Sequence, residues 1–310
     1  MDTRRALQVA SNHLLTLAGH SFDVLDISKP ISLDAALNLA KVISKLSPLL
    51  GNLIEFNTVE FLNKQPEFGS FGAWIRQDPG FPDAVFRGSI DPAPGFEIKA
   101  WFPLATELTA RFRDSQNHFL GEQTNVCMVA WLPGHLIYGK PYILDVVVVS
   151  GYSVAKARDE HYHRPPDYLV LEPQDTRTRT RNLQQTNTTG HKWQGSPAEF
   201  TEAQKIVESW GEDGNKYKPT TEYQSLLREL TSRFTYRLDT NYAKVDRIVH
   251  PEIEAFKTKV YNTDVNGMSV RKWLRLLGGK KRNKEKVALI KAALEERLQI
   301  REEGVGKLLA

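Results

Sequence analysis

Hydrophobic and polar positions change their spacing twice along the chain. Between residues 33 and 49 apolar side chains recur at helical intervals, which predicts a helix beginning after Ser32. Residues 81–173 instead show short runs of aromatic and β-branched residues between turn residues, and after residue 197 helical spacing returns. The predicted strands are 84–87, 96–102, 125–132, 143–150 and 168–172, and the later helices are 198–210, 221–234 and 284–300.

This order predicts an α/β protein, in which a central mixed β-sheet lies between layers of helices. The segment from Leu144 to Val149 is apolar apart from Asp145. Because a half-exposed strand would alternate polar and apolar residues, this run predicts a central strand that is covered on both faces.

Charged residues gather on one predicted hairpin. Glu97 and Lys99 are two residues apart on the strand 96–102, so both side chains point to the same face. Residues 91–95 read Asp-Pro-Ala-Pro-Gly, which favours a turn, and the preceding strand begins just after Asp83. A hairpin of this kind brings Asp83 close to Glu97 and Lys99.

Two carboxylates and an ammonium group on one sheet edge suit a specific chemistry. Carboxylate oxygens are ligands for a hard cation such as Mg²⁺, and a lysine beside them can orient a water molecule or neutralise developing negative charge. Hydrolysis of a phosphodiester needs both functions. A solvated strand with alternating charges is the plainer interpretation of Glu97 and Lys99 taken alone.

Pro82-Asp83, thirteen intervening residues and Glu97-Ile98-Lys99 resemble the signature of the PD-(D/E)xK nuclease superfamily. The size and layout of the chain are most similar to those of a type II restriction endonuclease. The resemblance implies a restriction-endonuclease-like core, a Mg²⁺ cofactor, and Mg²⁺-dependent cleavage of double-stranded DNA at a short symmetric site by a homodimer.

The resemblance implies roles for two further acidic residues. Members of the superfamily often carry a glutamate on the helix before the active site, and Glu55 matches it by position, although a solvated helix residue is an equal alternative. Asp91 lies six residues before Glu97, and some members use such a short spacing for the first metal ligand. We therefore expect Asp83 and Glu97 to bind the metal, with Asp91 as the alternative to Asp83.

Residues 174–193 form the segment most suited to DNA. Arginine reads guanine and glutamine or asparagine reads adenine, whereas lysine and threonine suit phosphates. A solvated loop is the alternative to a recognition loop. Together with the basic stretch 271–286, this segment supplies the DNA-binding candidates: Arg177, Arg179, Arg181, Gln184, Gln185, Asn187, Lys192, Lys280, Lys281 and Arg282.

From these patterns we expect the chain to consist of three parts. Residues 1–80 form a helical N-terminal part packed on the core, residues 81–196 a catalytic sheet core with the DNA-recognition loop, and residues 197–310 a helical C-terminal part with the basic patch.

Composition is compatible with this interpretation. The net charge of +4 permits a polyanionic partner, and the only cysteine, Cys127, lies in an apolar run and is expected to be buried. We expect no membrane segment, no nucleotide cofactor and a cytoplasmic location. Two alternatives to a restriction enzyme remain open: a repair or mobile-element nuclease with the same site, and a catalytically inactive DNA-binding protein.

Overall fold

The structure is a computed structural model that describes residues 1–77, 80–104, 112, 123–160, 167–172, 188–193, 195–216, 218, 220–238, 248–278 and 283–301. The chain forms two compact units, each of which combines segments that are distant in sequence. Unit 1 comprises Met1–Leu108, Cys127–Val148 and Glu252–Ala310, and unit 2 comprises Thr109–Val126 and Val149–Pro251. Unit 1 therefore draws on all three stretches distinguished by sequence.

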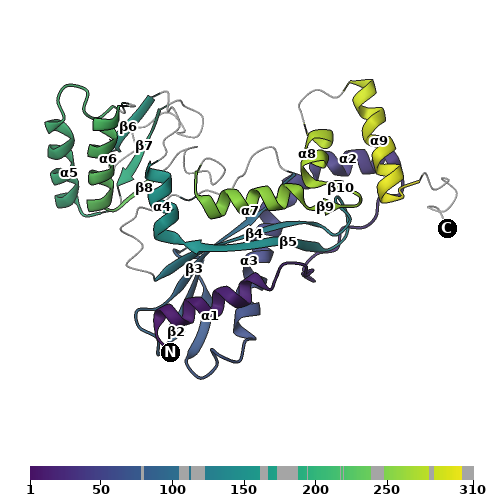
Figure 1. Cartoon of the computed structure of the whole chain (residues 1–310), viewed down its shortest axis with the longest axis horizontal. Coiled ribbons are helices and arrows are strands. Elements are labelled where there is room, and N and C mark those ends of the chain that lie inside the picture. Colours follow the sequence, from purple (N-terminus) through teal and green to yellow (C-terminus); the bar gives the residue numbers. More distant parts are fainter. Residues whose placement is uncertain are drawn as a thin grey trace. The chain divides into compact units, whose positions relative to one another are not determined.

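A five-stranded mixed sheet, which lies mainly in unit 1, has the strand order β1-β2-β3-β4-β5 (Figure 1). The pairs β1–β2 and β2–β3 are antiparallel. The α/β fold class and the predicted strand positions are confirmed, and β1 is an additional strand. The bounds are Gly72–Arg76 for β1, Ala84–Gly88 for β2, Gly95–Trp101 for β3, Thr124–Pro133 for β4 and Pro141–Ser150 for β5.

Helices of unit 1 cover both faces of this sheet (Figure 1). Gly51 lies against one face, where an added β-carbon would be 3.6 Å from that of Ala100. On the other face the ring of Trp101 is 5.7 Å from that of Phe256 and 5.4 Å from that of Tyr261. The helices are α1 (Thr3–Leu15), α2 (Leu33–Val42), the 3₁₀ helix η1 (Ile43–Leu46), α3 (Ser47–Asn63), α7 (Pro251–Asn262), α8 (Val270–Leu277) and α9 (Lys284–Leu298), with the short hairpin β9 (Asp264–Val265) and β10 (Met268–Ser269) between α7 and α8.

Aromatic packing under the β1–β2–β3 strands determines which way the polar residues point. The Trp74 ring lies 5.3 Å from that of Phe86 and 5.2 Å from that of Phe96, and all three side chains are buried. Since successive residues of a strand alternate between faces, the burial of Phe96 places Glu97 on the opposite side of the sheet.

The predicted helix 33–49 is wrong in its length. Ser32 caps the start as expected, accepting a hydrogen bond from Ala35 N at 3.1 Å. The helix then tightens into η1 at Ile43, and α3 begins separately at Ser47 with Pro48 in its first turn. Because proline lacks an N–H and clashes with the preceding turn, a continuous helix through Pro48 is disfavoured.

The predicted central strand, Leu144 to Val149, is in fact the last strand of the sheet, whereas β4 lies inside it and is almost wholly buried. The outer side of β5 is covered in part by the chain around residue 20. Gly19 N donates to Ile143 O at 2.8 Å, and Phe22 N donates to Pro141 O at 2.9 Å. An apolar edge strand is therefore possible here because another segment satisfies its backbone.

The described part of unit 2 contains a separate three-stranded sheet in the order β6-β7-β8 and three helices. β7 is parallel to β6 and antiparallel to β8. The last six residues of the predicted loop 174–193 therefore form a strand, which corrects that prediction. The elements are α4 (Gly151–Glu160), β6 (Asp167–Glu172), β7 (Thr188–Trp193), α5 (Pro197–Ser209), α6 (Thr221–Arg233) and β8 (Tyr236–Leu238).

Candidate functional site

The β2–β3 hairpin brings the Pro-Asp and Glu-x-Lys motifs together. Ala84 is paired with Phe96, so the next pair of positions along the two strands is Asp83 and Glu97. The backbone N–H of Ile98 donates a hydrogen bond to Asp83 Oδ2 at 2.7 Å, which fixes the carboxylate over the start of the hairpin.

Lys99 joins the two carboxylates. Its Nζ lies 3.3 Å from Asp83 Oδ2 and also donates a hydrogen bond to Glu97 Oε1. The exposed fractions of these side chains are only 16% for Lys99, 19% for Asp83 and 9% for Glu97. The three charges are therefore largely shielded from water. In this partly buried environment their interactions are stronger than they would be on an open surface.

The environment keeps Lys99 protonated. Burial by itself would lower the pKa of Lys99, but the negative charges of Glu97 and Asp83 and the hydrogen bonds to them outweigh it, and the pKa rises. Lys99 therefore acts in this structure as a fixed positive charge, which is the form that stabilises an anion.

Glu55 approaches the same cluster from α3. Its Oε1 accepts a hydrogen bond from Nε of Arg76, the last residue of β1, at 2.8 Å, and its side chain is 15% exposed. Burial raises the pKa of Glu55, the Arg76 hydrogen bond lowers it, and the charge of Asp83 raises it again, so that the pKa lies above its ordinary value. The influence of Asp83 shows that Glu55 shares the electrostatic environment of the hairpin site.

Side-chain amides hold the strands that carry this cluster. Asn63 accepts from Trp74 N at 2.8 Å and donates to Trp74 O at 2.9 Å, which ties the end of α3 to β1. Gln77 donates from its side chain to Pro82 O at 2.9 Å and from its backbone N–H to Asp83 O at 2.7 Å. These contacts hold Arg76, at the end of β1, and Asp83, just before β2, close to one another.

The structure brings the four residues proposed from sequence as catalytic close together: Lys99 contacts both Asp83 and Glu97, and the charges of Asp83 and Lys99 act on Glu55. Sequence reasoning missed Arg76 and Gln77. Both lie just before the Pro82-Asp83 motif, but no spacing distinguishes them from other polar residues, because their role depends on α3 and on the β1–β2 pairing.

Asp91, the alternative metal ligand, is exposed in the turn between β2 and β3 and makes no hydrogen bond or ion pair with the described part of the chain. Lys192 lies in β7, where its side chain is outside the described part. The other DNA-binding candidates lie outside the described residues: Arg177, Arg179, Arg181, Gln184, Gln185, Asn187, Lys280, Lys281 and Arg282.

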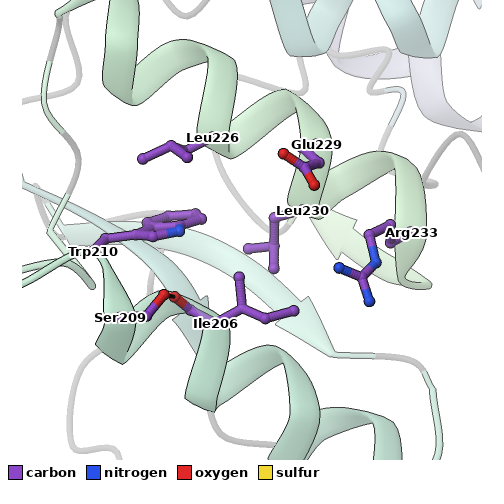
Figure 2. Close-up of a pocket in the computed structure, with 7 residues that line it drawn as sticks. All are labelled: Ile206, Ser209, Trp210, Leu226, Glu229, Leu230 and Arg233. Carbon is purple, nitrogen blue, oxygen red and sulfur yellow. Dashed lines mark hydrogen bonds between the residues drawn. The ribbon is translucent and has the colours of Figure 1, made fainter.

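Unit 2 contains a pocket of about 380 Å³ between α5 and α6, and Figure 2 shows the side chains gathered there. The Trp210 ring forms one wall and packs against Tyr223 at 5.4 Å, and Arg233 is paired with Glu202 at 2.8 Å. The pocket shares no residue with the carboxylate–lysine cluster. Its lining consists of Ile206, Ser209, Trp210, Leu226, Glu229, Leu230 and Arg233.

Within the residues that the structure describes, no group of three or more histidine, cysteine, aspartate or glutamate side chains is arranged to hold a metal ion. No helix of the same part of the chain is long and apolar enough to cross a membrane. Comparisons with protein-family models, with curated proteins and with solved structures found no match.

Proposed function

We propose that this protein is a Mg²⁺-dependent endonuclease that hydrolyses phosphodiester bonds of double-stranded DNA at a specific site, as type II restriction enzymes do. The observation that carries the proposal is the contact of the Lys99 ammonium with the carboxylates of both Asp83 and Glu97 on the β2–β3 hairpin. Metal-dependent hydrolysis of a phosphodiester uses this combination, in which carboxylate oxygens hold the ion and a positive charge stabilises the developing negative charge.

The carboxylates fit Mg²⁺. Asp83 and Glu97 approach the same ammonium group, so the two carboxylates gather around one positive charge, and both side chains are mostly buried. Mg²⁺ keeps several waters and is usually held by one or two carboxylates together with substrate phosphates, so a third protein carboxylate is not required. Asp83 and Glu97 would therefore hold the ion, and Glu55 would hold a water beside it.

Each residue has a distinct task in hydrolysis. The bound ion would lower the pKa of a water and polarise the phosphoryl oxygens. Lys99, which is protonated, places a positive charge where negative charge grows on the phosphate. The hydroxyl of water becomes bonded to phosphorus, the bond from phosphorus to the sugar oxygen breaks, and the leaving oxygen takes up one proton. Arg76 donates a hydrogen bond to Glu55 and limits the positions its side chain can take.

Double-stranded DNA is the proposed substrate, and a homodimer the proposed active form, because a symmetric site needs two copies of one reading surface related by a two-fold axis. The segment 174–193 supplies the arginine and amide side chains for base edges. Lys280, Lys281 and Arg282 are proposed to bind phosphates.

The test is to incubate the purified chain with phage DNA and Mg²⁺, with Glu97→Gln as the control that retains the shape of the side chain. Discrete fragments from the wild-type protein and none from the variant would support a site-specific endonuclease. Nicked DNA without fragments would favour a repair or mobile-element nuclease, and binding without any cleavage would favour an inactive DNA-binding protein. Equal cleavage by Glu97→Gln would overturn the proposed site.

A further inference from the structure

The positive charge of the chain is concentrated near its C-terminal end. Residues 271–286 contain eight basic residues and one acidic residue, a net charge of +7, whereas the whole chain has a net charge of +4. The remaining residues therefore carry −3 in total. This stretch is therefore strongly basic and would attract a polyanion, and its described parts belong to α8 and α9.

Buried side chains fix the orientation of α8. Trp273 is wholly buried, and its Nε1 donates a hydrogen bond to Val265 O at 2.7 Å. Val270 and Leu277 are buried on the same side of the helix, and Ser269 caps its start. Because these contacts prevent the helix from rolling, the opposite side is held toward solvent.

The side held toward solvent is basic. Arg271, Lys272 and Arg275 are exposed, and α8 contains no acidic residue. Arg271 lies with its guanidinium 4.9 Å from the centre of the Tyr261 ring, which restricts its position. None of the three forms a salt bridge with a carboxylate in the described part of unit 1.

Three other lysines of unit 1 are paired with carboxylates, unlike the cations of α8. Lys140 pairs with Asp23 at 2.8 Å, and Lys259 pairs with Asp145 at 2.8 Å. Lys291 pairs with Asp34 at 2.7 Å. These charges are compensated within the protein, whereas Arg271, Lys272 and Arg275 form no ion pair with a carboxylate in the described part of the chain.

From this surface we propose that α8 is a clamp for the phosphates of double-stranded DNA, in which Arg271, Lys272 and Arg275 contact the backbone without reading bases. The inference rests on the proposed function for its choice of polyanion. An eight-residue helix is about 12 Å long, and duplex DNA carries one charge per about 1.7 Å of its axis, so the three cations can meet several phosphates. Such contacts add affinity for every sequence.

The test measures binding of a fluorescent 20-base-pair duplex of random sequence to the full chain in EDTA, at several salt concentrations from 50 to 200 mM. The variant Lys272→Gln/Arg275→Gln removes two phosphate contacts and should reduce the salt slope by about 1.8. From 50 to 200 mM salt, the wild-type protein should therefore lose affinity by a factor about ten times larger than the variant does. The swap Lys272→Arg/Arg275→Lys should retain the wild-type slope.

Lys41→Gln/Lys64→Gln is the matched control, because both lysines are exposed in unit 1 and the same two charges are lost. An equal slope change in this control, or no change in the α8 variant, would overturn the clamp. A wild-type protein that binds anionic phospholipid vesicles but not the duplex would also overturn it. Cleavage is measured separately with Mg²⁺: a changed slope without any cleavage would support the clamp and reject only the nuclease.

Discussion

Lys99 Nζ lies 3.3 Å from Asp83 Oδ2, although the two residues are sixteen positions apart in the chain. The antiparallel pairing of β2 with β3 creates this contact, and Ile98 N–H holds the aspartate in place from the neighbouring position. The relationship distinguishes Asp83 from Asp91, which is exposed at the turn of the same hairpin.

We expect Asp83→Asn to abolish Mg²⁺-dependent cleavage while DNA binding and folding persist, because asparagine keeps the shape of the side chain but not its charge. Asp91→Asn is the matched control on the same hairpin and should cleave as the wild-type protein does. Cleavage of plasmid or phage DNA at saturating Mg²⁺ is the measurement. The opposite outcome, with loss only in Asp91→Asn, would assign the first metal ligand to the short spacing.

Lys99→Met should reduce cleavage by about 10²–10³-fold, as expected for the loss of one group that stabilises charge in the transition state. Its second effect is on stability: without the ammonium, Asp83 and Glu97 repel each other, and Mg²⁺ should raise the melting temperature more than it does in the wild-type protein. Lys140→Met removes an exposed ion pair with Asp23 and should change neither property. An unaltered response to Mg²⁺ in Lys99→Met would argue against a shared metal site.

Glu55 should make stability depend on pH in a defined direction. Its pKa in the folded protein lies above the ordinary value of 4.5, so the folded state binds the proton more tightly than the unfolded state does. Wild-type stability should therefore decrease relative to Glu55→Gln as the pH rises from 4.5 through the raised pKa, and the difference should then level off. Melting temperatures measured in EDTA from pH 4 to pH 8 would show this, and an increasing difference in favour of the wild type would contradict it.

Gln77→Leu should weaken catalysis by releasing the chain that carries Asp83. The substitution removes the side-chain hydrogen bond to Pro82 O, and a neutral hydrogen bond contributes about 0.5–1.5 kcal/mol, so we expect at most about a tenfold loss in kcat/KM. The Mg²⁺ concentration for half-maximal activity should rise as well, because Asp83 is a proposed metal ligand.

Gln65→Leu provides the control for Gln77→Leu. Gln65 is likewise partly buried and donates one side-chain hydrogen bond, to Phe61 O at 2.8 Å, but it lies at the end of α3 and contacts none of the site residues. Equal Mg²⁺ dependence in the two variants would show that Gln77 supports the fold in general and does not position Asp83.

The hairpin that carries the site could be predicted from sequence because its determinants are local. The alternation of Phe96, Glu97, Ile98 and Lys99 gives the two charged residues one face by the period of a strand, and the proline-rich turn brings Asp83 back beside them. The burial of Cys127 was predicted in the same way, from an apolar run, and is confirmed; burial raises the pKa of its thiol to about 12.

Tertiary structure alone decided the surroundings of that hairpin. Glu55 and Arg76 are twenty-one residues apart and meet only because α3 packs on β1, and the apolar strand β5 is at the sheet edge only because residues near Gly19 cover it. Local propensity acts between neighbours in sequence, whereas such contacts depend on which surfaces bury each other once the whole unit is compact. The sequence by itself determined which residues share a strand face. Tertiary packing determined that α3, Arg76 and the Gln77 amide lie beside them.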